Sequence, residues 1–417
     1  MSKESFSLKL SEIADVVAGQ SPESIYYSNI EGVPFLQGNR TFGTLYPSID
    51  TYTSKVTKLA KKDEVLMSVR APVGDLNFAP CDLCIGRGLA SIKAKDGNNK
   101  FIYYALKYNI NNLLRQGSGT TFDSVNKDVI NDFELILPKD KADRDKVTNI
   151  LSALDYKIEL NNRINAELEA MAKTLYDYWF VQFDFPDENG KPYKTSGGKM
   201  IWNEELKREI PEGWEVEILN NNVSCILDHR GKTPLKLGGD WVNKGEGVIA
   251  LSAKHVKDGK LVKLEDANIV SYDMYERWMP EKLKDGDILM TSEAPLGEFY
   301  FILNDTNYCM SQRLFAIRAD KSKILSTYLY YELSKGNGYS QLIGKASGST
   351  VFGIRQDELR KVNILKPKLD LQITFDDKIK PMLLRIRNNE FQNQKLTELR
   401  DWLLPMLMNG QVTIKSN

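Results

Sequence analysis

The chain has 417 residues, a length that allows two or three domains with cores of their own. Hydrophobic residues make up 42% and charged residues 27%, a globular composition that excludes a disordered chain. Its 56 Lys and Arg balance 56 Asp and Glu, so net charge gives no sign of a nucleic-acid partner. No apolar run approaches the roughly 18–20 residues of a membrane span, and the N-terminus lacks a secretory signal, so we expect a cytoplasmic protein.

A first module is expected at residues 1–139. Segments 64–69 and 133–137 are aliphatic and bounded by Gly or Pro, which predicts short strands in a mixed α+β domain. Cys81 and Cys84 form a C-x-x-C pair, but Cys225 and Cys309 lie far away in the sequence. A structural zinc site needs further ligands nearby, so we expect buried thiols and no metal.

A long helix is expected next, at residues 140–182, because apolar residues recur there at alternating spacings of four and three. This spacing is typical of the a/d seam of a coiled coil. Such a helix would be about 60 Å long at a rise of 1.5 Å per residue. The pattern returns at residues 369–417 at a constant offset of 228, although Pro381 predicts a kink or a new helix start.

Two asparagines interrupt each of these seams. Asn161 and Asn165 lie in the first, and Asn389 and Asn393 lie at the equivalent positions of the second. A polar seam residue costs stability unless it meets a partner, and its best-attested use is to fix register. Antiparallel pairing of the helices would bring Asn161 near Asn393 and Asn165 near Asn389. The alternative is that these side chains face solvent.

The connector at residues 183–213 raises a catalytic alternative. Asp187, Glu205 and Lys207 fit the loose acid-pair-plus-lysine pattern of Mg²⁺-dependent nucleases. Such a site needs its acids on adjacent strands, whereas the intervening ENGKPYKTSGGK is typical of an exposed loop. The sequence also lacks a phosphate-binding loop and a dinucleotide-binding glycine pattern.

The second module, at residues 214–368, repeats the first. Residues 285–298 (DGDILMTSEAPLGE) match residues 62–75 (KDEVLMSVRAPVGD), and residues 347–367 match residues 118–138. Cys309 aligns with Cys84, which favours a repeated core position for both. We therefore expect an α+β fold in which two similar globular domains are separated by two long antiparallel coiled-coil helices, related by a pseudo-two-fold internal duplication.

Two similar but non-identical modules at a fixed separation suit DNA half-sites about 34 Å apart. Because the modules differ, this architecture predicts an asymmetric, two-part DNA target. A coiled-coil scaffold that binds only protein is the alternative from another functional class.

Three segments carry a resemblance to a known family. They are residues 175–193 (LYDYWFVQFDFPDENGKPY), 209–216 (EIPEGWEV) and 396–410 (LTELRDWLLPMLMNG). They resemble the specificity subunits of type I restriction-modification systems, and with the duplication the resemblance covers essentially the whole chain. It implies that each module is a target recognition domain for one half of a bipartite double-stranded DNA site. It also implies that the helices set the spacer and dock two methylase subunits.

The resemblance further implies that the chain is not an enzyme and has neither catalytic residues nor a cofactor of its own. In the family, the methylase subunits bind S-adenosylmethionine and transfer its methyl group to adenine N6. Restriction subunits, which use ATP and Mg²⁺, join the same complex.

Candidate DNA contacts are polar side chains, since base edges and phosphates are bound by such groups on loops and helix starts. Glu293 stands where Arg70 stands in the first copy, and an acid can accept from cytosine N4 whereas arginine favours guanine. The alternative for each isolated candidate is a solvated surface charge. The other candidates are Arg40 and Arg87 in the first module and Lys254, His255, Gln312, Arg313 and Arg355 in the second.

Two repeated small-residue runs are further candidates for phosphate contact, because they are donor-rich and precede predicted helices. A purely structural turn is the alternative for both. The runs are Ser118, Gly119, Thr120 and Thr121 in the first module and Ser347, Gly348, Ser349 and Thr350 in the second.

Overall fold

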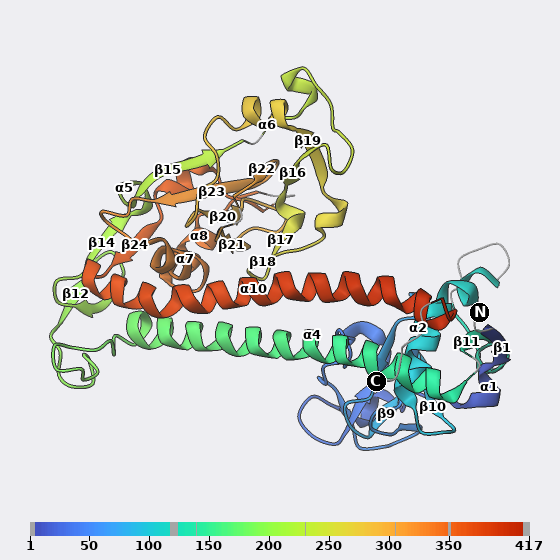
Figure 1. Cartoon of the computed structure of the whole chain (residues 1–417). Helices are drawn as coiled ribbons and strands as arrows, with labels where there is room; N and C mark the ends of the chain where they lie inside the picture. Colours follow the sequence, from blue (N-terminus) through green and yellow to red (C-terminus); the bar gives the residue numbers. More distant parts are fainter. Residues whose placement is uncertain are drawn as a thin grey trace. The chain divides into compact units, whose positions relative to one another are not determined.

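The computed structural model describes residues 5–116, 124–138, 140–229, 231–304, 306–348 and 352–411. The chain divides into two compact units (Figure 1). Unit 1 consists of Met1–Arg163 and Asn389–Asn417, and unit 2 of Ile164–Asn388. Each unit contains one α+β module and a stretch of each of the two long helices. None of the helices in the described part of the chain is long and apolar enough to cross a membrane.

Module 1 is the α+β part of unit 1. A four-stranded antiparallel sheet has the order β2-β10-β7-β8, and a five-stranded sheet has the order β3-β5-β4-β9-β6, with β4 and β9 parallel. β1 pairs antiparallel with β11. The strands are β1 (Ser5–Lys9), β2 (Ala14–Ala18), β3 (Tyr27–Ser28), β4 (Val33–Leu36), β5 (Tyr52–Thr53), β6 (Leu59–Ala60), β7 (Val65–Ser68), β8 (Leu76–Phe78), β9 (Leu83–Ile85), β10 (Leu89–Ala94) and β11 (Glu134–Pro138), and the helices are α1 (Leu10–Ile13), α2 (Asn99–Gln116) and α3 (Lys127–Asn131).

β7 lies between two apolar cores, which explains why its sequence is continuously hydrophobic. Side chains alternate along a strand, so Val65 and Met67 enter the core that contains α2, whereas Leu66 enters a smaller core. That smaller core includes Leu36 of β4 and Ile85 of β9, so it ties the two sheets together.

Module 2, in unit 2, repeats this plan. Its four-stranded sheet has the order β15-β23-β20-β21, its three-stranded sheet has the order β19-β16-β22 with β16 and β22 parallel, and β14 pairs with β24. The strands are β14 (Glu215–Ile218), β15 (Val223–Asp228), β16 (Gly247–Leu251), β17 (Val256–Lys257), β18 (Lys260–Leu261), β19 (Asn268–Ser271), β20 (Ile288–Thr291), β21 (Phe299–Phe301), β22 (Tyr308–Met310), β23 (Leu314–Ala319) and β24 (Asn363–Lys366), and the helices are α5 (Leu219–Asn222), α6 (Tyr272–Trp278), α7 (Ser326–Ser334), α8 (Asn337–Gly344) and α9 (Gln356–Arg360).

The two aligned cysteines occupy equivalent places in these modules. Cys84 lies in β9 and Cys309 in β22, and both are fully buried in the strand that pairs parallel with β4 or β16. All four cysteines are free thiols. Among the described residues, no group of three or more His, Cys, Asp or Glu is placed to hold a metal ion.

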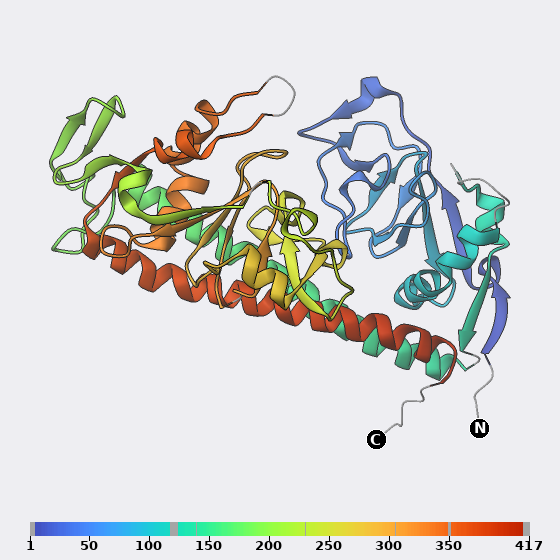
Figure 2. The same ribbon diagram turned by 90° about the horizontal axis from the view of Figure 1, so that it is seen from above.

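The two long helices are α4 (Lys141–Tyr176), which continues into a π-helical turn (Asp177–Val181), and α10 (Leu369–Met408). Figures 1 and 2 show them side by side. In unit 1, Asp155 meets Arg400 and Asn161 meets Asn393, so the helices are antiparallel there. Every a/d seam position of the two helices is buried or partly buried. These positions are Val147, Leu151, Leu154, Ile158, Asn161, Asn165, Leu168, Ala172, Leu175 and Trp179 in the first helix and Phe375, Ile379, Met382, Ile386, Asn389, Asn393, Leu396, Arg400, Leu403 and Leu407 in the second.

The same antiparallel pairing holds in unit 2. The Asn165 amide donates to the Ile386 carbonyl at 3.4 Å, and the Tyr176 ring lies 6.3 Å from that of Phe375. The prediction of a new helix start at Pro381 is wrong, because α10 runs through it without interruption. Pro381 is exposed, so water can satisfy the carbonyl that loses its helical donor, while buried Ile379 holds the helix on the core.

The connector between α4 and module 2 forms a hairpin of β12 (Met200–Asn203) and β13 (Arg208–Pro211). The aromatic residues at the end of α4 join the core of unit 2: Phe180 packs edge-on against Tyr328, and Phe183 and Phe185 pack against Trp214. The end of α4 is thereby anchored to module 2.

Candidate nucleic-acid interface

Three arginines predicted from the sequence line one cavity of module 1, with a volume of about 530 Å³. Arg40 follows β4, Arg70 follows β7 and Arg87 follows β9. β4 and β9 are parallel, so their C-terminal ends reach the same edge of the sheet, and this places Arg40 and Arg87 at one rim. We call Arg40, Arg70 and Arg87 the first cluster.

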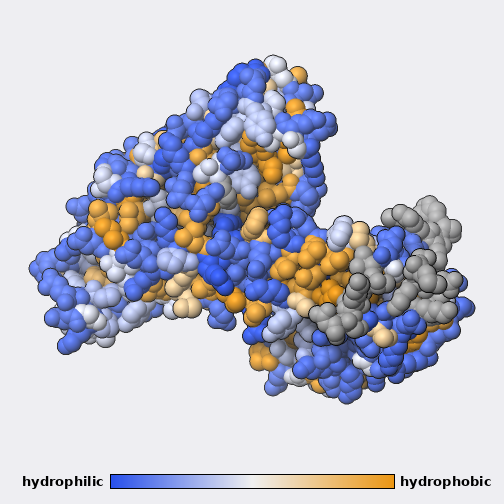
Figure 3. All heavy atoms as spheres, viewed as in Figure 1, coloured by the Kyte–Doolittle hydropathy of each residue, from blue (hydrophilic) through white to orange (hydrophobic). Residues whose placement is uncertain are grey.

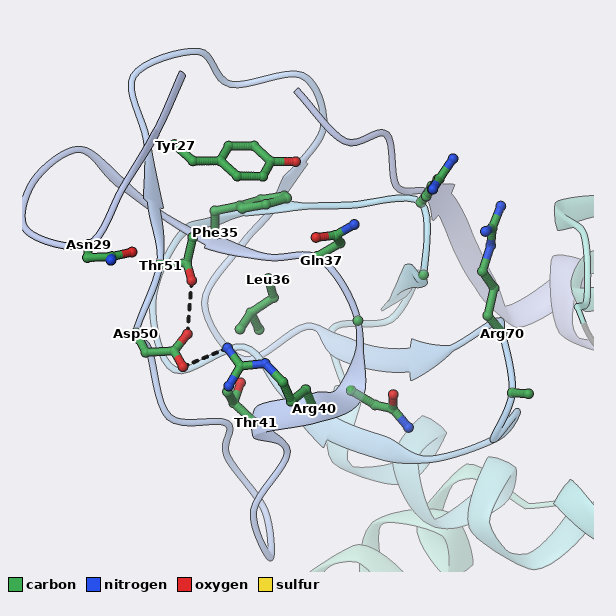
Figure 4. Close-up of a pocket in the computed structure, with 15 residues that line it drawn as sticks. Tyr27, Asn29, Phe35, Leu36, Gln37, Arg40, Thr41, Asp50, Thr51 and Arg70 are labelled. Atoms are coloured by element: carbon green, nitrogen blue, oxygen red, sulfur yellow. Dashed lines mark hydrogen bonds and ion pairs between the residues drawn. The ribbon is translucent and has the colours of Figure 1, made fainter. Parts of the chain in front are cut away.

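The cavity has an aromatic wall and a charged floor (Figure 4). The rings of Tyr27 and Phe35 lie 4.9 Å apart between centroids. Arg40 Nη2 is 2.7 Å from Asp50 Oδ2, and the Thr51 hydroxyl donates to Asp50 Oδ1 at 3.0 Å. The hydrogen bond from Arg40 is the main reason why the pKa of Asp50 lies below its usual value.

The members of the first cluster therefore differ in charge balance. Arg40 is neutralised by Asp50, whereas no described residue forms a hydrogen bond or an ion pair with the side chain of Arg70 or Arg87. Both side chains are exposed. The cavity thus presents two uncompensated guanidinium groups, the usual partners of phosphate oxygens and of guanine.

The second module places its candidates on an equivalent backbone. Glu293 follows β20 as Arg70 follows β7, and Gln312 follows β22 as Arg87 follows β9. Equivalent backbone hydrogen bonds hold both copies. The bond from Val69 N–H to the Gly88 carbonyl in module 1 corresponds to the bond from Ser292 N–H to the Arg313 carbonyl in module 2, and each is 2.9 Å long. The bond from Gly86 N–H to the Leu36 carbonyl, at 2.8 Å, corresponds to the bond from Ser311 N–H to the Leu251 carbonyl, at 2.7 Å.

The side chains on this shared backbone are different in module 2. Arg313 Nε lies 3.0 Å from Glu293 Oε1, forming a half-exposed ion pair where module 1 has Gly88 and Arg70. Gln312 and Arg355 are exposed. Gln312 precedes Arg313 in the chain, and Arg355 is close to this pair because the N–H of its neighbour Ile354 donates to the Ser292 carbonyl. We call Glu293, Gln312, Arg313 and Arg355 the second cluster.

His255 does not lie on the exposed surface expected from the sequence. It lies in the turn after β16, as Arg40 lies in the turn after β4, but it is only 1% exposed, and its Nδ1 accepts from the Ser252 N–H at 2.9 Å. Burial, followed by the charge of Lys254, lowers its pKa, which favours the neutral ring. His255 therefore closes the turn after β16, and the exposed Lys254 donates to the Asp266 carbonyl.

The small-residue runs are described only in part. Residues 118–121 and 349–350 lie outside the described residues. Ser347 and Gly348 are exposed, and Ser347 exchanges two backbone hydrogen bonds with Gly353. This part of the second run thus forms a short β-bridge and is not the start of a helix. Gly353 also bridges to Glu293, so the run lies beside Glu293.

The sequence matches the family described as "Type I restriction modification DNA specificity domain" over residues 3–170 and again over 211–400. The chain belongs to this family. It carries the domain twice, as the two modules with their helices indicate.

Individual relatives agree with the assignment. A stretch of 163 residues is 38% identical to a Methanocaldococcus jannaschii protein assigned to the MjaX type I restriction enzyme as specificity subunit, covering 38% of each chain. The MjaIX type I restriction enzyme specificity subunit of the same organism is 23% identical over 98% of this chain and 93% of that protein. In fold, the chain is similar to the crystal structure of a type I restriction-modification S subunit from M. genitalium, with a TM-score of 0.59, 14% identity, and coverage of 99% and 97% of the two chains.

Three of the four seam asparagines of this specificity-domain protein are buried, and Asn393 is partly buried. Asn161 Nδ2 lies 2.9 Å from Asn393 Oδ1 and 2.7 Å from Gln392 Oε1 in unit 1, and Asn393 Nδ2 donates to Asn162 Oδ1 at 2.8 Å. Asn165 is 2% exposed in unit 2, and Asn389 is 3% exposed in unit 1. The amides replace apolar seam contacts by directional bonds, which suits a role in fixing register.

The nuclease alternative finds no support in the geometry. Asp187 Oδ1 accepts from the N–H groups of Asn189 and Lys191 at 2.8 Å, so it closes a turn, and Lys207 pairs with Glu204 at 3.0 Å. These groups stabilise the connector and do not converge on a metal position.

Sequence reasoning missed several residues of the site. Asp50 and Tyr27 line the cavity of the first cluster, but Asp50 lies in an irregular segment and Tyr27 lies in β3, a strand of two residues that is too short to show periodicity. Gly353 was also missed, although the repeat aligns it with Ser124, which bridges to Arg70 in module 1. That alignment was the available signal.

Proposed function

We propose that this chain is the sequence-specificity subunit of a type I restriction-modification complex. In this function module 1 and module 2 each read one half of a bipartite, asymmetric double-stranded DNA target. The single observation that carries the proposal is the duplicated backbone after β7/β9 and β20/β22, on which different polar side chains stand. One scaffold with two sets of side chains is what two different half-sites require.

The first cluster supports contact with DNA most directly. Arg70 and Arg87 are exposed cations without described partners beside an open cavity. Phosphate contacts of this kind supply salt-dependent affinity, and replacing one weakens binding uniformly and reduces the salt slope by about 1. The second cluster contains its own acid, so it contributes less to this nonspecific attraction.

In this proposal the chain binds no cofactor and has no catalytic residues. Methylase subunits supply S-adenosylmethionine-dependent methyl transfer to adenine N6, and restriction subunits use ATP and Mg²⁺. The helices α4 and α10 set the spacing between half-sites and dock two methylase subunits.

Exposed apolar residues on α10 support the docking role. In unit 1, Phe391 is 63% exposed, Leu399 42% and Trp402 56%. Figure 3 shows hydrophobic surface over this C-terminal part of α10. Large apolar side chains gathered on an exposed helix mark an interaction surface. The double variant Phe391→Ala and Trp402→Ala should therefore weaken methylase binding, with Tyr272→Ala, an exposed aromatic of α6, as the control.

The experiment that tests the function is co-expression with the methylase subunits in a host that lacks other adenine methylases, followed by mapping of methylated adenines. A two-part motif with an unread gap is expected. Exchange of residues 214–368 for the same module of a relative should replace one half of the motif and preserve the other. Methylation without a motif, or a motif that changes in both halves, would contradict the proposal.

The alternatives give different outcomes in the same system. Mg²⁺-dependent cleavage by the isolated chain, lost in Asp187→Ala, would establish the nuclease. Normal complex assembly without any sequence preference in DNA binding would establish the protein-binding scaffold.

A further inference from the structure

Arg313 has an unusual backbone for an arginine. Its φ is 64°, in the left-handed region that glycine adopts readily and a long side chain seldom does. The equivalent position in module 1 is Gly88, whose φ lies outside this region, so the left-handed conformation is specific to module 2. An arginine retained in a conformation that disfavours it indicates that its side chain has a use at this place.

The guanidinium of Arg313 is held from one side only. Its Nε lies 3.0 Å from Glu293 Oε1, and no described residue accepts a hydrogen bond from Nη1 or Nη2. The Arg313 side chain remains 49% exposed. The edge that carries the two Nη groups is therefore available for a bidentate contact.

Glu293 is itself fixed by its neighbours. It forms an isolated β-bridge with Gly353, and a Cβ on residue 353 would lie 2.9 Å from both Glu293 Cβ and the Ser292 carbonyl oxygen. Only a glycine allows this approach, because the space that a side chain would need is already filled. The carboxylate is thus delivered to Arg313 from a constrained backbone.

We propose that Arg313 reads a guanine in the half-site of module 2, and that Glu293 is the positioning residue that orients it. The inference rests on the proposed function and names the base class for one half-site. Guanine presents O6 and N7 in the major groove, and a guanidinium fork matches this pair of acceptors. Glu293 leaves that fork free while it limits rotation of the side chain, which reduces the ordering cost of the contact.

Module 1 lacks this arrangement, which makes the inference specific to one half. Gly88 stands at the position of Arg313, and Arg70 stands at the position of Glu293. The arginine of module 1 therefore follows β7, the equivalent of β20, and no described carboxylate pairs with it. Variants of the Glu293–Arg313 pair should therefore alter the half-site of module 2 alone. Variants of Arg70 should act on the other half.

The test uses the complete complex with its methylase subunits and maps methylated adenines for Arg313→Ala, Arg313→Lys and Glu293→Gln. Arg313→Ala and Arg313→Lys should relax one G·C pair of one half-site, with discrimination against other base pairs reduced about 10- to 100-fold. Glu293→Gln should reduce it about 3- to 10-fold. Arg277→Ala is the matched control, because Arg277 forms an exposed ion pair with Asp273 on α6 and should leave the motif unchanged.

Failure of the inference and failure of the function are distinguishable. If the wild-type complex yields no bipartite motif, the proposed function fails. If it yields one whose module 2 half lacks an invariant G·C pair, or if Arg313→Ala leaves the motif intact, the inference is overturned.

A second measurement distinguishes a loss of guanine recognition from a folding defect of the variant. The complex carrying Arg313→Lys is titrated with duplexes that hold each of the four base pairs at the relaxed position. Selective loss for the G·C duplex supports the inference. An equal loss for all four duplexes assigns Arg313 a structural role and overturns it.

Discussion

A buried ion pair between the long helices of unit 1 gives the sharpest test of the fold. Asp155 of α4 is 1% exposed, and its carboxylate accepts from Arg400 of α10 at 2.7 Å and from the Tyr104 hydroxyl of α2 at 2.6 Å. Burial, and then the charge of Asp155, raises the pKa of Tyr104, so its hydroxyl remains a donor. Three helices therefore meet on one carboxylate.

Replacement of Arg400 by Met should destabilise unit 1 by about 3–5 kcal/mol, because it leaves a buried carboxylate with only a neutral donor. The double variant Asp155→Leu and Arg400→Met should recover part of this loss, since apolar side chains then fill the site. About 1–3 kcal/mol of the loss should remain, because the Tyr104 hydroxyl has lost its acceptor.

Hydrogen exchange followed by mass spectrometry reports each unit separately. For Arg400→Met, amides that exchange through opening of unit 1 should exchange about 100- to 5,000-fold faster, since about 1.4 kcal/mol corresponds to a factor of ten. Peptides of unit 2 should be little affected. Arg277→Met, which removes an exposed ion pair 2.8 Å long, is the control and should cost below about 1 kcal/mol. An acceleration of less than about fivefold for Arg400→Met would refute the reasoning.

Three further changes follow from local contacts. Asn161→Ala removes a donor to two acceptors on α10 and should lower the unfolding free energy of unit 1 by about 1–3 kcal/mol in urea; an unchanged midpoint would mean that water replaces the amide. Because the pKa of His255 is lowered from 6.5, its contribution to stability is present above pH 6.5 and is lost as pH falls through its folded-state pKa. His255→Asn should flatten that part of the pH profile of hydrogen exchange in β16, and an unaltered profile would assign the loss elsewhere. A Cβ on Gly19 would lie 2.8 Å from the Ile85 carbonyl oxygen, so Gly19→Ala should lower the free energy of unfolding by about 1–3 kcal/mol. The control Gly38→Ala should lower it little, because the space around Gly38 is open. Equal thermal stabilities of the two variants would contradict this prediction.

The architecture could be predicted because it repeats. Two copies of one pattern, offset by a nearly constant number of residues, identify equivalent strands even where neither copy alone is distinctive. The helices were equally predictable, since the seam spacing persists over many turns and Asn161 and Asn389 interrupt it at equivalent positions. Both signals are extended along the sequence, so single substitutions do not erase them.

The candidate site was less predictable because it depends on pairings across irregular segments. Nothing near Arg40 indicates that Asp50, ten residues later, neutralises it. Nothing near His255 indicates that it is buried, whereas Arg40 in the corresponding turn of module 1 is exposed. Glu293 was considered as an acceptor for cytosine N4, but one of its carboxylate oxygens already meets Arg313. Burial and ion pairing are decided by the fold around these residues, and local sequence does not report them.

The duplicated backbone also explains how one module could change its target while the fold persists. The hydrogen bonds that hold the positions of Arg70 and Glu293 are made by main-chain groups of the neighbouring residues, so they form whichever side chain stands there. Both side chains are partly or largely exposed, and exposed ion pairs contribute only about 0–1 kcal/mol. Exchanging a basic residue for an acidic one at this place therefore costs little stability but reverses the charge presented beside the cavity. A buried residue such as Asp155 has no such freedom, because its partners lie on two other helices and a change in it alone leaves them unsatisfied.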